Sequence, residues 1–196
     1  MDFKNYIPHQ SFPHIEKWIT ELNIDIRFVS ARKTKLGDYQ FRNNQHFITV
    51  NNNLNKYAAL ITLTHEIAHA FTFAEFGKTV KPHANQWKEN FKKLMLNFFD
   101  HNIFPNEILS ALSRYLINPS ASTTNDESLS LILRKYDSEI FLTISEISDG
   151  DHFTYYGKKY LKYQKIRKRI KCLNLNNNRV YLFNPITQIK KINLKI

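Results

Sequence analysis

The alternation of apolar and polar residues predicts a series of helices and strands along the first part of the chain. Apolar side chains recur at helical intervals over residues 13–22, which predicts an amphipathic helix. They alternate with polar side chains over residues 24–29, 35–41 and 46–50, which predicts three strands. A longer helical pattern covers residues 56–73. We expect a helix and a three-stranded antiparallel sheet packed beside this long helix.

The pattern changes from helical spacing to strand spacing near residue 140. Before that point, apolar residues predict helices near residues 87–98, around Ile108 and Leu112, and near residues 129–133. After it, short alternating stretches separated by turn residues predict strands at residues 153–156, 158–163, 170–173, 179–183 and 188–192. The chain is therefore expected to have an α+β fold with a small β-rich C-terminal domain.

The net charge of the chain is concentrated in its last quarter. The whole chain carries 28 Lys and Arg residues and 17 Asp and Glu residues, which gives a net charge of +11. Residues 151–196 contain 12 of the cations and only one acid, Asp151, so residues 1–150 are neutral overall. This asymmetry predicts two domains, 1–147 and 148–196, and favours a polyanionic partner for the second.

Composition excludes several other classes of protein. The single cysteine, Cys172, rules out an internal disulfide and a zinc ribbon built from several cysteines. No stretch approaches the roughly 18 consecutive apolar residues of a membrane-spanning helix, and the first residues lack an apolar signal region. We therefore expect a cytoplasmic protein with no membrane partner.

The sequence His65-Glu66-Ile67-Ala68-His69, inside the long predicted helix, indicates a metal site. Residues four positions apart lie on one face of a helix, so His65 and His69 can bind the same metal ion. Glu66 lies one step round the helix, where it can act on a water molecule held by that ion. Catalytic zinc takes three protein ligands and leaves a fourth position for water. Spacing alone leaves three residues as possible third ligands: Glu75, His83 and Glu89.

Four blocks of sequence follow one another along the chain: Arg32–Gly37, Ile48–Asn51, Leu63–His69 and His83–Trp87. Together they resemble the SprT/Spartan-type zinc metalloproteases, and the resemblance extends over residues 10–100. It implies a zincin-like core around the His-Glu-x-x-His helix. It also implies that a His-Gly-x-x-aromatic segment supplies the third ligand, which falls on His83, with Ala84 in place of the glycine.

The resemblance implies a function as well. Zinc would be held by His65, His69 and His83, and Glu66 would be the catalytic base that hydrolyses peptide bonds of a protein substrate. Substrates attached or crosslinked to DNA are implied by the same resemblance. The cysteine-rich zinc ribbon of SprT proteins is missing from this chain, so DNA binding depends on the charge of its C-terminal part.

Basic and aromatic residues are mixed in that C-terminal part, a composition that suits phosphates and unstacked bases. Tyr160 and Tyr163 lie among the cations. The candidate DNA-binding residues are Lys158, Lys159, Lys162, Lys165, Arg167, Lys168, Arg169 and Lys171. Two other functions stay open: a nucleic-acid-binding module whose metal site is structural or vestigial, and a general cytoplasmic peptidase unrelated to DNA.

Overall fold

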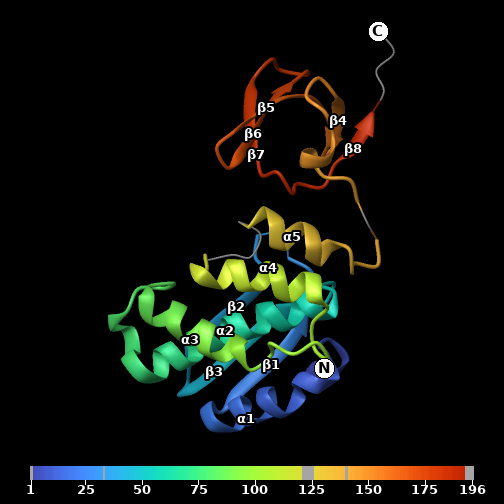
Figure 1. The fold of residues 1–196 in the computed structure, drawn as a ribbon. Coiled ribbons are helices and arrows are strands. Elements are labelled where there is room, and N and C mark those ends of the chain that lie inside the picture. Colours follow the sequence, from blue (N-terminus) through green and yellow to red (C-terminus); the bar gives the residue numbers. More distant parts are fainter. Residues whose placement is uncertain (1, 33, 121–125, 140, 193–196) are drawn as a thin grey trace. The chain divides into compact units, whose positions relative to one another are not determined.

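The computed structural model describes residues 2–32, 34–120, 126–139 and 141–192, and the chain divides into two compact units (Figure 1). The first unit spans Met1–Ser138 and the second spans Glu139–Ile196. Each has its own cluster of buried apolar residues. The second unit includes residues 139–147, which precede the boundary expected from the charge, because Ile144 and Ile147 are buried in its core.

The first unit combines helices with one small sheet, as the apolar pattern predicts. Its helices and strands, in chain order, are α1 (Phe12–Leu22), β1 (Ile24–Val29), β2 (Gly37–Arg42), β3 (Gln45–Asn51), α2 (Lys56–Phe76), α3 (Asn85–Leu96), α4 (Asn106–Ile117) and α5 (Glu127–Arg134). Within the described residues, no helix combines the length and the apolar composition needed to cross a membrane.

The sheet of the first unit is mixed, so the expectation of an antiparallel sheet is wrong. Strand β3 lies in the centre, parallel to β1 and antiparallel to β2. The cause is the connection from Val29 to Gly37, which carries the chain past β3 before β2 begins. Arg32 in this connection is bound to the end of β3, where its Nε donates to Asn51 Oδ1 and its Nη1 donates to Thr49 Oγ1, both at 2.9 Å. The hairpin from β2 to β3 then leaves β3 running in the same direction as β1.

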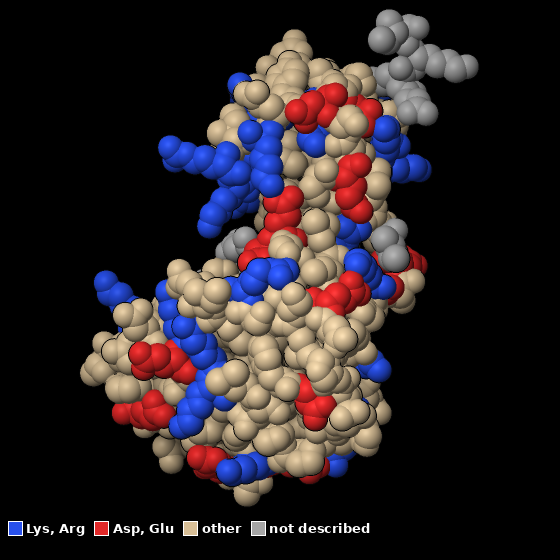
Figure 2. All heavy atoms as spheres, viewed as in Figure 1, with Lys and Arg blue, Asp and Glu red and all other residues tan. Residues whose placement is uncertain are grey.

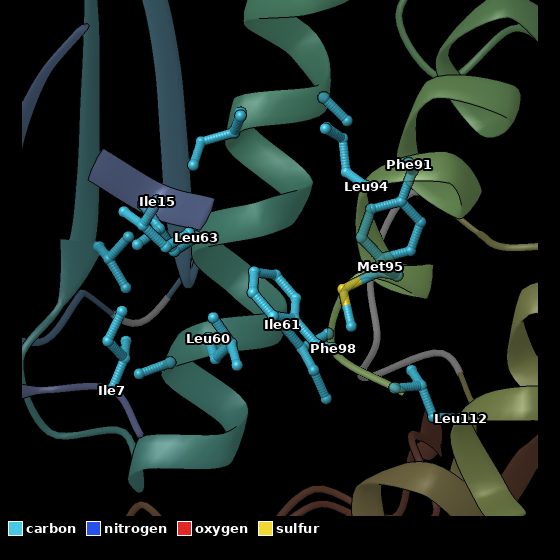
Figure 3. Packing of buried hydrophobic residues seen from close by; sticks show 14 of the residues in the cluster. Ile7, Ile15, Leu60, Ile61, Leu63, Phe91, Leu94, Met95, Phe98 and Leu112 are labelled. Carbon is cyan, nitrogen blue, oxygen red and sulfur yellow. The ribbon is translucent and has the colours of Figure 1, made fainter. Parts of the chain in front are cut away.

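Helix α2 lies at the centre of the first unit and is packed on several sides. Every residue from Ala59 to Ala68 is buried. Leu63 lies on the side of the helix that faces Ile15, and Ile61 lies on the opposite side, facing Phe98 (Figure 3). A helix that is apolar all round has to be enclosed by other elements. Packing therefore fixes the position of the helix that carries the His-Glu-x-x-His sequence.

The second unit is built on a five-stranded antiparallel sheet with the strand order β7-β6-β5-β4-β8. Its strands are β4 (His152–Tyr155), β5 (Lys158–Ile166), β6 (Arg169–Asn174), β7 (Val180–Phe183) and β8 (Lys190–Ile192). The core contains Phe153, Tyr160, Ile170 and Cys172. The two units together confirm the α+β fold and the β-rich C-terminal part.

Candidate metal centre and basic surface

Three histidine side chains converge beside helix α2. His65 and His69 lie one turn apart on α2, and His83 comes from the segment between the short helix Gly77–Thr79 and α3. The Nε2 atom of His83 lies 3.1 Å from Nε2 of His65 and 3.1 Å from Nε2 of His69. One possible ligand atom from each residue lies within 4.8 Å of the other two. The structure thus brings together the three histidines that the sequence analysis selected.

The arrangement suits a tetrahedral zinc ion better than a set of hydrogen bonds. Zinc binds imidazole nitrogen at about 2.0–2.1 Å, so two nitrogens at tetrahedral positions lie about 3.3 Å apart. The Nε2 separations of 3.1 Å are close to that value. A neutral imidazole carries one N–H group, so Nε2 of His83 can donate to only one of its two neighbours. A single cation would satisfy the lone pairs of all three nitrogens.

The backbone at His83 has the left-handed conformation, with a φ of 61°. This conformation is uncommon for residues that carry a side chain, and it recurs at functional sites. The next residue, Ala84, has a φ of −66° and a ψ of 177°, extended values that any residue adopts. Alanine in place of glycine at this position therefore does not disturb the backbone that presents His83.

Trp87 on α3 contacts the rings of all three histidines. Its ring centroid lies 4.5 Å from that of His65, 5.3 Å from that of His69 and 4.8 Å from that of His83. Its Nε1 donates to the backbone oxygen of His65 at 3.3 Å. Trp87 is fully buried and stacks on Phe91, so it supports the histidine cluster from within the core. This role was not predicted from the sequence, where the position of Trp87 four residues after His83 was the one available signal.

A second aromatic residue contacts His69 from strand β2. Tyr39 stacks on His69, with 6.1 Å between the ring centroids and 11° between the ring planes. The Tyr39 hydroxyl forms a hydrogen bond with Nδ1 of His46, 2.9 Å away. This arrangement was not predicted, because residues on two neighbouring strands carry no local signal in the sequence of their pairing with a helix.

Burial favours the neutral form of the histidines in this cluster. Burial, with smaller contributions from His69 and His83, lowers the pKa of His65 to about 2. Burial and the neighbouring His83 lower the pKa of His69 to about 3, and burial also lowers the pKa of His83. Neutral imidazole is the form that binds a metal ion. The cluster is therefore ready to bind a cation at neutral pH.

Glu66 follows His65 on α2, and only 7% of its surface is exposed. Burial raises the pKa of its carboxyl to about 8, and the negative charge of Asp38 acts in the same direction, while Arg32 and Lys35 oppose them. A carboxyl whose pKa lies near neutral pH can both take up and release a proton under ordinary conditions. This residue has the environment of a general base or acid.

The two glutamates that compete with His83 as third ligand lie outside the cluster. Glu75 and Glu89 are both exposed. Glu75 accepts a hydrogen bond from Asn90 Nδ2 at 2.9 Å. Among the residues that the structure describes, the group of possible metal ligands around His83 includes neither glutamate.

Most of the candidate DNA-binding residues are exposed on the second unit. Figure 2 shows Lys and Arg side chains gathered on one side of this unit. We call the exposed cations of β5, β6 and their connecting turn the basic hairpin; they are Lys158, Lys159, Lys165, Arg167, Lys168 and Arg169. Lys171 is half-buried. Lys165, Arg167, Lys168 and Arg169 lie around the turn from β5 to β6, whereas Lys158 and Lys159 lie at the other end of β5.

One candidate DNA-binding residue, Lys162, and the neighbouring Tyr160 face the interior of the second unit. Lys162 is buried, and its Nζ donates to the backbone oxygen of Ile147 at 2.6 Å. Of the two tyrosines that lie among the cations, Tyr160 is buried in the apolar core, where its ring stacks on Phe153. Both point inward because alternate residues of a strand face the same side. Tyr163 is exposed and keeps a ring available for stacking.

Comparison with known proteins gives one family match. The sequence model of the SprT-like family matches residues 9–106, a segment that contains the three histidines, Glu66 and Trp87. This segment is half of the chain and lies within the first unit. No curated protein and no solved structure gives a significant match.

Proposed function

The chain belongs to the SprT-like family, and from this premise we propose that it is a zinc-dependent metallopeptidase acting on protein substrates. The observation that carries the proposal is the convergence of three imidazole nitrogens beside a helix that also carries the buried Glu66. The donor set suits zinc, because neutral imidazoles are ordinary zinc ligands and three of them leave one position of a tetrahedral site free.

The proposed mechanism assigns a role to each residue of the cluster. His65, His69 and His83 would hold the ion through their Nε2 atoms. Zinc at this position would polarise a peptide carbonyl and lower the pKa of a water molecule to about 7. The Glu66 carboxylate would take a proton from that water and return it to the leaving nitrogen of the cleaved peptide. Trp87 would keep the three imidazoles in place throughout.

A structural or vestigial metal site is the main rival to catalysis. Structural zinc sites are closed by four protein ligands. Within the described parts of the chain, the cluster supplies three. A purely structural site also has no need of a buried glutamate on the same helix as its histidines, since burying a carboxylate is unfavourable. These two features favour a site that is open to substrate.

The replacement Glu66→Gln tests the proposal, because it keeps the size of the side chain and removes the base. We expect wild-type zinc content and folding, with proteolysis reduced about 10²- to 10⁴-fold. The matched control is Glu89→Gln, which changes an exposed glutamate in the same way and should leave cleavage unchanged. Near-normal cleavage by Glu66→Gln, on any protein that the wild type degrades, would refute the mechanism.

We further propose that the substrates are proteins attached to DNA. Two features support this: residues 151–196 carry the whole net charge of +11, and the cations of the basic hairpin are exposed. Surfaces of this kind bind phosphates without sequence preference, and their affinity falls as salt concentration rises. Such a surface would bring the peptidase to proteins held on DNA.

Cleavage of one protein in two forms, free and crosslinked to DNA, tests this finer proposal. The crosslinked form should be cleaved faster at low salt, and the difference should disappear at high salt, where charge is screened. A general peptidase unrelated to DNA would cleave both forms at the same rate at every salt concentration. A nucleic-acid-binding module would bind the crosslinked form and cleave neither.

A further inference from the structure

The carboxylate of Glu66 occupies the space that a side chain at Gly37 would need. A Cβ atom added to Gly37 would lie 2.8 Å from Cγ and 2.9 Å from Cδ of Glu66, and closer still to Oε1. Atoms in a close-packed interior do not approach this closely without moving. Any residue other than glycine at position 37 therefore requires the backbone of β2, helix α2 or the Glu66 side chain to shift.

The backbone at Gly37 is held in place from the preceding residues. Asn51 at the end of β3 donates through Nδ2 to the backbone oxygens of Arg32 and Lys35, at 3.1 Å and 3.0 Å. Its backbone N–H donates to the oxygen of Leu36 at 2.9 Å. Gly37 itself is paired with β3 as the first residue of β2. These hydrogen bonds resist a retreat of the β2 backbone away from α2.

Helix α2 is equally constrained, because its residues from Ala59 to Ala68 are buried. With both backbones fixed, the flexible partner is the Glu66 side chain itself. The backbone of Gly37 is not in the left-handed region, so its conformation is open to any residue. Glycine is needed at this position for the space that it leaves and not for an unusual backbone angle.

We propose that Gly37 is a positioning residue that fixes the Glu66 carboxylate against the start of strand β2. Because Gly37 has no side chain, the Glu66 carboxylate can occupy the space beside its backbone. An alanine at position 37 would displace this carboxylate while the three histidines stay in place. The consequence for catalysis rests on the proposed peptidase function, whereas the contact between the two residues does not.

A double-mutant cycle on the zinc-free protein tests the contact. Gly37→Ala should lower the urea midpoint of unfolding in the wild type, because the added Cβ meets Glu66. In a Glu66→Ala background the same substitution should cause no loss, since the obstructing side chain is gone. We expect the two effects to differ by roughly a factor of 10 in the unfolding equilibrium constant. Equal effects of Gly37→Ala in both backgrounds would overturn the proposal.

Zinc content and proteolysis test the consequence. Gly37→Ala should bind zinc as the wild type does and lose about 100-fold in kcat, with KM unchanged, because only the base is displaced. The matched control is Gln40→Ala, at an exposed position of the same strand, which should retain full activity. Wild-type kcat for Gly37→Ala would overturn the positioning role. Should the wild type cleave no protein, the peptidase function fails, and the unfolding cycle still decides the contact.

Discussion

The two units of this protein place their candidate functional residues in different environments. The first unit gathers a few of them in its interior, where His65 and Glu66 are buried and Trp87 touches all three histidines. The second unit spreads its cations over the basic hairpin, where they are exposed to solvent. Buried groups are positioned by packing, so a single atom can displace them. Exposed cations act on a polyanion through their summed charge, so no one of them is decisive.

Lys162 shows that this contrast follows environment and not residue type. It belongs to the same basic strand as Lys159 and Lys165, yet it is buried and donates to the backbone oxygen of Ile147. Its Nζ also lies 3.4 Å from Asp149 Oδ1. We therefore expect it to behave as a structural residue, in contrast to the exposed cations of the basic hairpin, for which we propose an external partner.

The largest expected effect is that of Trp87→Ala. Loss of a fully buried tryptophan should lower the free energy of unfolding by about 3–5 kcal/mol and should also weaken zinc binding, since three imidazoles lose their common support. Urea unfolding of the zinc-free protein and zinc competition titration measure the two effects. Tyr163→Ala, at an exposed aromatic residue, should stay within about 0.5 kcal/mol of the wild type. If Trp87→Ala binds zinc like the wild type, the supporting role is wrong.

A smaller effect should come from pH. The pKa of His65 is lowered to about 2 in the folded chain from an ordinary value of 6.5, so below pH 6.5 only the unfolded state takes up this proton. Stability should therefore fall as the pH falls through 6.5, by about 1.4 kcal/mol for this residue between pH 7.5 and 5.5 in zinc-free protein.

Urea midpoints at these two pH values, with His65→Gln for comparison, measure this dependence. The substitution removes the titrating group, so the midpoint should change less with pH. His101→Gln, which replaces an exposed histidine, should leave the dependence as it is. An identical dependence in the wild type and in His65→Gln would contradict the assignment.

The smallest effect on stability should come from the basic hairpin. Replacing Lys165, Arg167, Lys168 and Arg169 with glutamine should change the free energy of unfolding by less than about 0.5 kcal/mol, because all four are exposed. DNA binding should change strongly. If four or five phosphates are contacted, the logarithm of affinity falls with the logarithm of salt at a slope near −4, and the variant should lose most of that slope.

Lys162→Met is the matched control for the hairpin substitutions, since it removes one charge from the same strand. It leaves the Ile147 oxygen without its donor, so it should cost about 1–3 kcal/mol of stability while the salt dependence of DNA binding stays the same. If DNA binding loses its salt dependence in Lys162→Met, or keeps it in the hairpin variant, the assignment of Lys162 as structural and of the hairpin cations as DNA-binding is wrong.

The spacing of apolar residues predicted the helices and strands of both units, because this spacing depends only on residues that are near one another in the sequence. That pattern did not give the direction of β1 relative to β3, because the direction depends on how the connection between β1 and β2 crosses the sheet. The burial of Tyr160 and Lys162 could in principle have been predicted from the alternation of residues along β5. Residues at even spacing on β5 share a face, and Tyr160 is an apolar residue on that face.

The candidate site divides in the same way. His65, Glu66 and His69 are close in the sequence and lie close together on one helix, so the sequence alone indicated a site. Spacing did not distinguish His83 from Glu75 and Glu89 as the third metal ligand, and only the family resemblance favoured His83. The contacts that complete the cluster join α2 to β2 and α3, as Gly37 and Tyr39 show. No sequence pattern encodes such distances, because they depend on how three elements pack.

Zinc content of purified variants tests the central claim most directly. The account predicts about one zinc per chain in the wild type and in Glu89→Ala, because Glu89 is exposed and outside the cluster. It predicts a severe loss of zinc in His83→Ala, with the zinc-free protein still folded. Full zinc in His83→Ala together with loss of zinc in Glu89→Ala would contradict the three-histidine centre and the mechanism built on it.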